Sequence, residues 1–209
     1  MQNFEKAMES LIIAEGYYDF DPKDPGGETF CGIARNIHPL WNGWALIDGY
    51  KNDMPINNKN AKQLLLDNAE IKSRLYAFYR KEFWDYFSLD NAKLPLALEI
   101  FEQAVNLGQP QTARHLQKVL NALNYTESKG VEAYGPDLTV DGQWGAKSRN
   151  RFQAMLNQGY EKYIQYAVNA LQGSYYVQLA LEKPQTKRRY FKGWIGQRTH
   201  ACASENHVC

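Results

Sequence analysis

Three polar residues near the N-terminus have the types and spacing needed to break a glycosidic bond by acid catalysis. Glu15, Asp24 and Thr29 follow one another as Glu15-x8-Asp24-x4-Thr29. Breaking such a bond requires a carboxylic acid that donates a proton to the leaving oxygen and is still protonated near neutral pH. A second polar group must then meet the opposite face of the sugar. Glu15 is the candidate acid, and Asp24 and Thr29 are candidates for the second role.

Glu15 is placed where a protein can raise the pKa of a carboxyl group. Phe4, Met8, Leu11 and Glu15 follow one another at spacings of 4, 3 and 4, which predicts one face of a first helix. A free glutamate has a pKa of about 4.3. At the edge of an apolar stripe, desolvation disfavours the charged form, and the negative end of the helix dipole acts in the same direction. A buried structural glutamate would show the same stripe.

The segment after the first helix determines whether Asp24 and Thr29 lie near Glu15. Residues 19–27 hold two prolines and two glycines, which favours a turn-rich loop. Residues 28–35 read as an extended segment or one arm of a β-hairpin. A helix, a tight turn and a strand in this order would bring both residues back toward Glu15. Alternatively, Asp24 forms only a local hydrogen bond within its Asp-Pro-Gly-Gly turn.

The rest of the chain predicts a mainly α-helical fold. Asn57 or Asn58 is a plausible N-cap, and Pro95 suits the first turn of a helix. Helices are predicted over residues 57–87, 95–108, 110–123, 146–171 with a potential break at Gly159, and 174–182. Loops are predicted over residues 41–55 and 124–139, with a turn at Asp141-Gly142 and a basic, aromatic segment at 187–194. The prediction is a helical bundle with a short β-hairpin or extended segment near residues 24–35, beside the active-site cleft.

Composition narrows the class of partner. The 209 residues are 44% hydrophobic and 22% charged, with a formal net charge of +1. These are the values of an ordinary globular protein, and they predict no strong binding to nucleic acid or anionic membranes. The longest early apolar run, Leu11 to Ala14, is too short for a signal peptide or a membrane span. An extracellular target would therefore require export by a non-standard route.

Three cysteines are too few for a disulfide scaffold. Cys31 is predicted to be a small core residue. Cys202 and Cys209 lie in a C-terminal tail with His200 and His207, where they could bind zinc, form a disulfide loop or belong to a frayed terminus. We expect neither a metal ion nor a cofactor in the catalytic chemistry.

The N-terminal motif resembles a known family. Ala14-Glu15-Gly16-Tyr17-Tyr18-Asp19, then Asp24-Pro25-Gly26-Gly27-Glu28-Thr29 and Gly32-Ile33, resemble the opening of glycoside hydrolase family 108. That family comprises N-acetylmuramidases, including phage-type endolysins and muramidases that serve protein secretion. The resemblance implies a lysozyme-like fold with Glu15 as the essential acid and with Asp24 and Thr29 lining the cleft. We also expect Tyr17 and Tyr18 to bind substrate. Two departures are Gly16-Tyr17-Tyr18 in place of Gly-Gly-Tyr, and Cys31 where Tyr or Trp is common.

The second half resembles the same family's C-terminal peptidoglycan-binding region. The matching segments are Ile100 to Gly108, Ala113 to Gln117, Leu138 to Gly145 and Phe191 to Arg198. Asn106 and Gln117 are predicted to hydrogen-bond the sugar and Trp144 to stack on it, although helix termination and core packing explain these residues equally well. The predicted domains are a catalytic region over 1–92, a helical peptidoglycan-binding region over 93–200 and a tail over 201–209.

The resemblance implies hydrolysis of the β-1,4 bond between N-acetylmuramic acid and N-acetylglucosamine in the periplasm or cell wall. Two alternatives remain open at this point. A lytic transglycosylase also uses one glutamate, but it closes an anhydro ring without water, and a non-catalytic cell-wall-binding protein could assist secretion. The expected partners are peptidoglycan glycan strands, with a holin or secretion apparatus and an immunity protein as further candidates.

Overall fold

The computed structural model describes residues 2–21, 26–125 and 133–198, apart from the side chains of residues 2, 13–15, 197 and 198. The chain divides into two compact units, residues 1–84 (unit 1) and residues 85–209 (unit 2). Helices dominate both units, which confirms the predicted mainly α-helical class. The sequence predicted the boundary between the catalytic and peptidoglycan-binding regions between residues 92 and 93. No helix in the described part of the chain is both long enough and apolar enough to cross a membrane.

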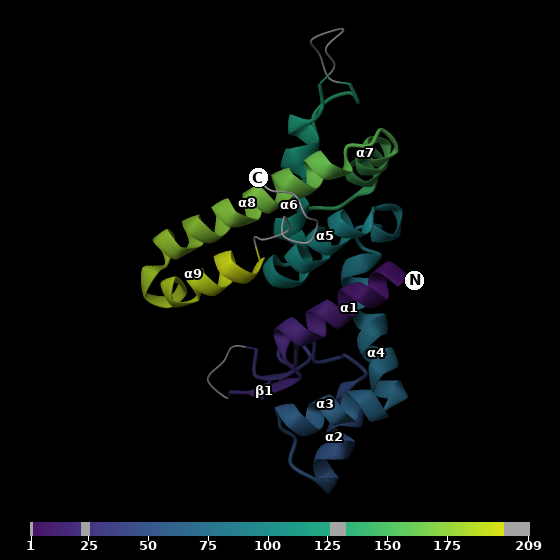
Figure 1. Ribbon diagram of the computed structural model, residues 1–209, viewed down its shortest axis with the longest axis vertical. Coiled ribbons are helices and arrows are strands. Elements are labelled where there is room, and N and C mark those ends of the chain that lie inside the picture. Colours follow the sequence, from purple (N-terminus) through teal and green to yellow (C-terminus); the bar gives the residue numbers. More distant parts are fainter. Residues whose placement is uncertain (1, 22–25, 126–132, 199–209) are drawn as a thin grey trace, which may run out of the picture. The chain divides into compact units, whose positions relative to one another are not determined.

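Unit 1 combines helices with one small sheet (Figure 1). Its elements are α1 (Gln2–Glu15), β1 (Tyr18–Phe20), β2 (Glu28–Phe30), β3 (Ile33–Ala34), α2 (Trp44–Asp53), α3 (Asn58–Asp67), α4 (Ala69–Tyr79) and the π-helix η1 (Arg80–Trp84). The predicted first helix is confirmed, because α1 ends at Glu15 and buries Phe4, Met8 and Leu11. These side chains form the stripe that anchors α1 in the core of unit 1.

The sheet has the strand order β1-β2-β3, and both pairs of strands are antiparallel. β2 and β3 form the hairpin that the sequence predicted, and β1 adds a third strand. Thr29 lies opposite Asp19 on one side and Ala34 on the other. Cys31 follows β2 with a φ of +46° and is buried, as predicted. The Tyr79 hydroxyl donates to the Cys31 carbonyl oxygen at 2.8 Å, which ties this turn to α4.

The prediction of a loop over residues 41–55 was wrong, because α2 occupies most of it. Trp44 and Ile47 are buried on one face of this helix, and their burial outweighs the low helix propensity of Gly49. Gly43 precedes the helix beneath the Trp41 ring, and a Cβ at Gly43 would lie 2.2 Å from that ring. A glycine is therefore required at the entrance to α2.

The single helix predicted over residues 57–87 is three elements. Asn57 is the N-cap of α3, as predicted, and forms a capping box with Asn60. Asn68 then adopts an extended backbone and caps α4 by accepting hydrogen bonds from two amides, those of Glu70 and Ile71. The side-chain acceptor of Asn68 compensates for the break by satisfying the first amides of the new helix.

Unit 2 is built from helices. Its elements are the 3₁₀-helix η2 (Leu89–Asn91), α5 (Leu94–Leu107), α6 (Gln109–Ala122), α7 (Ala146–Asn157), α8 (Glu161–Glu182) and α9 (Pro184–Arg198). The predicted break at Gly159 is confirmed, with a φ of +81°. The predicted interruption between residues 171 and 174 was wrong, because α8 continues through Gly173 and buries Val168, Gln172 and Tyr176.

Side-chain amides on α6 hold the irregular segment 134–143. The Gln117 amide donates to the Asp141 carboxylate and to the Gln143 carbonyl, and its oxygen accepts from the Gly142 N–H. Asn121 bonds both the N–H and the carbonyl of Leu138, each at 2.8 Å. These side chains satisfy backbone groups that no sheet or helix pairs. The predicted Asp141-Gly142 turn is therefore fixed by the helix that precedes it.

A chain of polar side chains crosses the core of unit 2. Gln103 Nε2 donates to Glu99 Oε1 at 2.9 Å, and Gln103 Oε1 lies 3.0 Å from His115 Nδ1. Asn169 Nδ2 donates to Glu99 Oε2 at 3.1 Å. Gln111 Nε2 lies 2.9 Å from His115 Nε2. Because the Gln103 amide nitrogen faces Glu99, its oxygen accepts from Nδ1–H, and the imidazole Nε2 accepts from Gln111. The network therefore holds His115 as a neutral ring.

Burial shifts the pKa values of Glu99 and His115, the two titratable groups of this polar network, in the directions that favour their neutral forms. Desolvation raises the pKa of Glu99 to about 7, although the hydrogen bonds from Gln103 and Asn169 oppose the rise. Desolvation, helped by the charge of Lys118, lowers the pKa of His115 to about 4. The free energy of unfolding of unit 2 must therefore depend on pH.

We predict opposite pH dependences for these two groups. The stabilisation from Glu99 is complete below pH 4.5 and is lost as the pH rises through about 7. The stabilisation from His115 is complete above pH 6.5 and is lost as the pH falls through about 4. In thermal unfolding, Glu99→Gln should therefore gain stability relative to wild type as the pH rises, by roughly 3 kcal/mol in total. His115→Gln should gain as the pH falls. Parallel pH profiles for wild type and Glu99→Gln would contradict this prediction.

Candidate active site

Glu15 is the last residue of α1, and the chain changes direction immediately after it. Gly16 has a φ of +77°, a left-handed conformation that L side chains rarely adopt. A glycine therefore ends the helix at the candidate acid, as the sequence predicted. β1 begins at Tyr18, so the acid and the sheet are separated by only two residues.

Asn58 fixes the path of the chain after Glu15. Its Oδ1 accepts from the backbone N–H of Tyr17 at 2.8 Å and from that of Tyr18 at 3.2 Å. Asn58 is the first residue of α3, but the capping of this helix is performed by Asn57. The sequence prediction treated Asn58 only as a potential N-cap. Two neighbouring amides that share one side-chain acceptor hold the segment following Glu15 in a single direction.

The candidates Thr29 and Asp24 belong to the sheet and to the connection that precedes it. Thr29 is the half-buried central residue of β2, between the buried side chains of Glu28 and Phe30. Asp24 lies outside the described residues, in the connection between β1 and β2. β1 starts three residues after Glu15, and its Asp19 lies opposite Thr29 of β2. The sheet therefore pairs Thr29 with a residue that is close in sequence to the end of α1.

Glu28 is a buried carboxylate that the sequence prediction did not single out. It is 6% exposed, and its Oε1 accepts from the Tyr18 hydroxyl at 3.0 Å and from Lys51 Nζ at 2.8 Å. Arg35 Nη1 donates to Oε2 at 2.8 Å, and Arg35 Nη2 also reaches Asp48 at 2.6 Å. With two cations and a hydroxyl on its oxygens, Glu28 is suited to remain an anion that ties the sheet to α2. The sequence signal that could have identified it is its i, i+2 spacing from Phe30, which places both side chains on the same face of the predicted strand.

The two predicted substrate-binding tyrosines are both half-buried. Lys62 Nζ lies 5.6 Å from the centre of the Tyr17 ring, within the range of a cation–π interaction. Desolvation, reinforced by the hydrogen bond to Glu28, raises the pKa of Tyr18 to about 12. Tyr18 therefore remains a neutral donor at physiological pH, and its hydroxyl is directed at Glu28.

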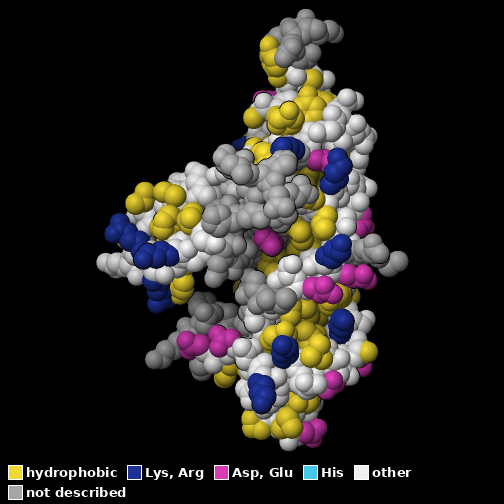
Figure 2. Space-filling model, in the orientation of Figure 1, with side chains coloured by type: hydrophobic (Ala, Val, Ile, Leu, Met, Phe, Trp, Pro, Cys, Tyr) yellow, Lys and Arg dark blue, Asp and Glu magenta, His cyan; other side chains and the backbone are white. Residues whose placement is uncertain are grey.

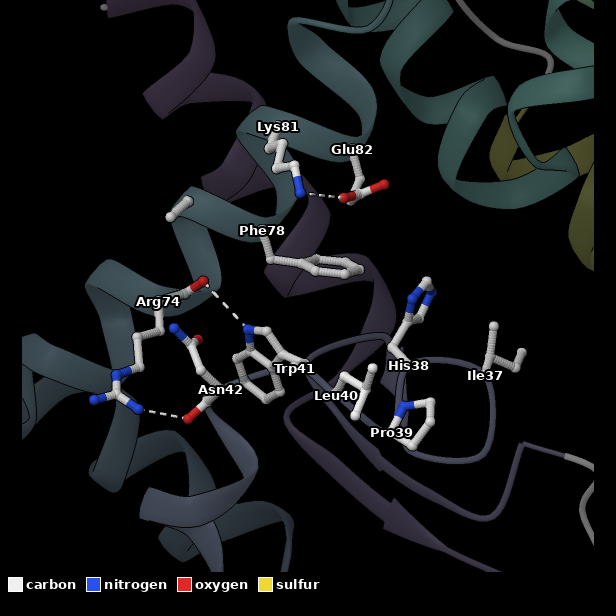
Figure 3. Close-up of a pocket in the computed structure, with 11 residues that line it drawn as sticks. Ile37, His38, Pro39, Leu40, Trp41, Asn42, Arg74, Phe78, Lys81 and Glu82 are labelled. Carbon is white, nitrogen blue, oxygen red and sulfur yellow. Dashed lines mark hydrogen bonds and ion pairs between the residues drawn. The ribbon is translucent and has the colours of Figure 1, made fainter.

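A pocket of about 510 Å³ lies in unit 1 between the 37–42 segment and the helices α4 and η1 (Figure 3). Phe78 extends from α4 toward His38, and their ring centres are 4.8 Å apart. Trp41 donates its indole N–H to the Arg74 carbonyl at 3.3 Å. The 37–42 segment is connected to the sheet, because the Asn36 N–H donates to the Gly26 carbonyl at 3.2 Å. This hydrogen bond therefore ties the start of the segment that lines the pocket to Gly26, just before β2.

The structure separates the three binding residues predicted in the second half. Asn106 is half-buried and lines a pocket of about 320 Å³. Gln117 is 1% exposed and bonds the Asp141-Gly142 turn, while Trp144 is 2% exposed and packs on Phe87 and Phe152. Sugar binding by Gln117 or Trp144 would require the fold to open, so their positions give them a structural role.

Within the described ranges, no group of three or more His, Cys, Asp or Glu side chains is arranged to hold a metal ion. The tail residues His200, Cys202, His207 and Cys209 lie outside these ranges.

Comparison with known families confirms the resemblance seen in the sequence. Residues 8–108 match the family described as Glycosyl hydrolase 108, and residues 111–199 match the one described as Predicted Peptidoglycan domain. The first match extends beyond unit 1 and includes α5. Among curated proteins, none matches the chain significantly.

A solved structure from Brucella abortus supports the fold. The chain is similar to the structure of Brucella abortus SagA, with 22% sequence identity and a TM-score of 0.53, over 96% of this chain and 91% of that chain. At this identity the similarity concerns the fold alone, and with the family match it confirms the mainly α-helical, lysozyme-like class. From these matches, the chain carries a glycosyl hydrolase 108 domain over residues 8–108, followed by a peptidoglycan domain over residues 111–199.

Proposed function

We propose that this protein is an N-acetylmuramidase that hydrolyses the β-1,4 bond between N-acetylmuramic acid and N-acetylglucosamine, with Glu15 as the general acid. The family match over residues 8–108 establishes a glycoside hydrolase, and the match over residues 111–199 indicates peptidoglycan as its substrate. The observation that carries the finer assignment is the position of Glu15 at the end of α1, directly before a left-handed glycine.

The surroundings of Glu15 support a catalytic glutamate over a structural one. The segment that follows it is held by Asn58, and a half-buried polar residue, Thr29, returns on β2. The other glutamate of this motif, Glu28, is surrounded by cations that stabilise its charged form. A general acid requires the opposite environment, in which the protonated form persists near neutral pH.

In the proposed reaction, Glu15 donates its proton to O4, the oxygen that links C1 of N-acetylmuramic acid to C4 of N-acetylglucosamine. The C1–O4 bond breaks, and the N-acetylglucosamine unit leaves with a free 4-hydroxyl. A water molecule oriented by Asp24 and Thr29 adds its oxygen to C1 and releases a proton, which restores the acid form of Glu15 through solvent. The reaction consumes one water molecule and no cofactor.

We further propose that unit 1 catalyses cleavage of the glycan strand and that unit 2 binds peptidoglycan. The catalytic group belongs to unit 1, and the residues of the peptidoglycan domain belong to unit 2. The site of action is then the periplasm or cell wall, reached by a non-standard route. A holin or secretion apparatus would supply that route, and an immunity protein would protect the producing cell.

Glu15→Gln is expected to lower the rate of sacculus digestion at least a hundredfold, because it removes the proton that the leaving oxygen needs. Turbidity loss of purified sacculi measures the rate, and mass spectrometry identifies the new ends. Wild type should release reducing N-acetylmuramic acid ends. Anhydro-muramic ends would show a lytic transglycosylase, and equal activity of the two proteins would exclude Glu15 as the acid.

Asp24→Ala is expected to reduce the rate less than Glu15→Gln, by about tenfold, because it disturbs the orientation of water without removing the acid. The same sacculus assay compares the variants, with circular dichroism to check that the helices are intact. If folded Asp24→Ala loses as much activity as Glu15→Gln, Asp24 is a second essential carboxylate and the proposed mechanism is wrong in that respect.

Asn58→Ala is expected to lower kcat about tenfold with little change in KM, because it removes the acceptor that positions the segment after Glu15. Asn58→Asp keeps an acceptor but adds a negative charge. It should recover much of kcat and move the alkaline limb of the pH–rate profile upward, since a nearby anion raises the pKa of a carboxylic acid. Asn57→Ala is the matched control, because it weakens the cap of α3 but leaves Asn58 in place. Equal losses of kcat in Asn57→Ala and Asn58→Ala would reduce Asn58 to a purely structural role.

A further inference from the structure

Unit 2 contains a pocket between the end of α5 and the helices α8 and α9. Its volume is about 320 Å³, and it is lined by Asn106, Leu107, Tyr175, Tyr176, Leu179, Lys187 and Trp194. This volume is at the lower end of the range for ligand sites, and it suits one sugar ring with its substituents. Of the described residues that line it, Lys187 alone carries a charge. The pocket therefore combines aromatic rings, one amide and one cation.

Aromatic packing builds the walls of this pocket. The rings of Tyr176 and Trp194 stack with centres 5.0 Å apart and planes inclined by 22°, which holds α9 against α8. Tyr190 continues the stack on Trp194 at 5.9 Å. The half-buried Tyr175 contacts the buried His115 ring at 5.9 Å, with the planes inclined by 72°. Rings held in this way are ordered before a ligand arrives, which lowers the entropic cost of binding.

The charge around the pocket is positive. α9 has no acidic residue, and its basic residues are Lys187, Arg188, Arg189, Lys192 and Arg198. Figure 2 shows Lys and Arg side chains gathered beside apolar ones over the end of unit 2 that holds the α8–α9 turn. Lys187 lies within this helix and lines the pocket. A ligand with both a sugar ring and a carboxylate would match this combination.

We propose that this pocket binds a muropeptide, with an N-acetylated sugar ring against Tyr175 and Trp194, its amide at Asn106 and a stem-peptide carboxylate at Lys187. The proposal rests on the assignment of peptidoglycan as the substrate. Asn106 offers a donor and an acceptor on one side chain, which matches an acetamido group. The lysine selects strands whose stem peptides extend a carboxylate beyond the lactyl group, over glycan whose only carboxylates are the lactyl groups themselves. The site therefore retains the protein on peptide-bearing wall.

The test is the binding of the disaccharide N-acetylglucosaminyl-N-acetylmuramic acid, with and without its stem peptide, to the full-length protein by calorimetry. This disaccharide ends in muramic acid and lacks the bond that a muramidase cuts, so the unmodified enzyme can be used. Tyr175→Leu and Lys187→Met change the pocket. Tyr163→Leu and Lys192→Met are the matched controls, because these exposed residues on α8 and α9 do not line it.

We expect Tyr175→Leu to weaken binding of both ligands about tenfold, through loss of the aromatic surface. Lys187→Met should weaken binding about threefold for the peptide-bearing ligand only, since a half-exposed ion pair contributes modestly. The controls should bind as wild type does. Unchanged binding in Tyr175→Leu and Lys187→Met, or equal losses in the controls, would overturn the proposal.

Cleavage of a longer soluble glycan that contains the scissile bond separates the two claims. If all four variants cut it at the wild-type rate while the pocket variants bind the disaccharide as wild type does, the pocket proposal fails and the muramidase assignment stands. If wild type does not cut it, the proposed function fails, and the calorimetric comparison still decides whether the pocket binds muropeptides.

Discussion

The direction in which the chain leaves Glu15 depends on one acceptor, the Asn58 amide oxygen. Gly16 allows the chain to turn because a positive φ is accessible to glycine at little cost. A flexible glycine alone does not fix the direction of the chain after the turn. Asn58 selects it by accepting from the two amides that follow Gly16. β1 begins at the second of these amides, and its Asp19 pairs with Thr29 of β2. A residue of α3 thereby controls the geometry after the proposed acid.

Two glutamates of the same motif have different tasks. Glu28 is buried as an anion, and such a charge is tolerable only because Lys51, Arg35 and Tyr18 donate to its oxygens. These bonds fasten the sheet to α2. The proposed role of Glu15 needs a site that favours the neutral carboxyl group. Lys51 and Arg35 are therefore engaged in holding β2 to α2 through Glu28.

In unit 2, carboxamide side chains satisfy backbone N–H and carbonyl groups that helices and strands satisfy elsewhere in the fold. Gln117 and Asn121 on α6 pair with backbone groups of the 138–143 segment, which lies in no helix or strand. Gln103 links a buried carboxyl group to a buried imidazole, and desolvation shifts the pKa of each group in the direction that favours its neutral form. The basic side chains of α9 in the same unit are exposed or half-buried where the structure describes them. The cationic surface of α9 is suited to contact with an acidic polymer.

The sequence by itself predicted the fold class and most of the helices, and it supplied the acid that we propose. Local signals were enough for the end of α1 at Glu15, the cap at Asn57 and the breaks at Gly159 and Gly108, because each depends on nearby residues. The tertiary structure alone decided what depends on distant ones. α2 forms because Trp44 and Ile47 on its apolar face are buried. The helix predicted over residues 57–87 is interrupted at Asn68, whose side chain caps α4. Glu28 is held by ion pairs with Arg35 and Lys51. Asn58 and the Tyr175–Trp194 pocket join residues far apart in the chain, and no local spacing predicts such contacts.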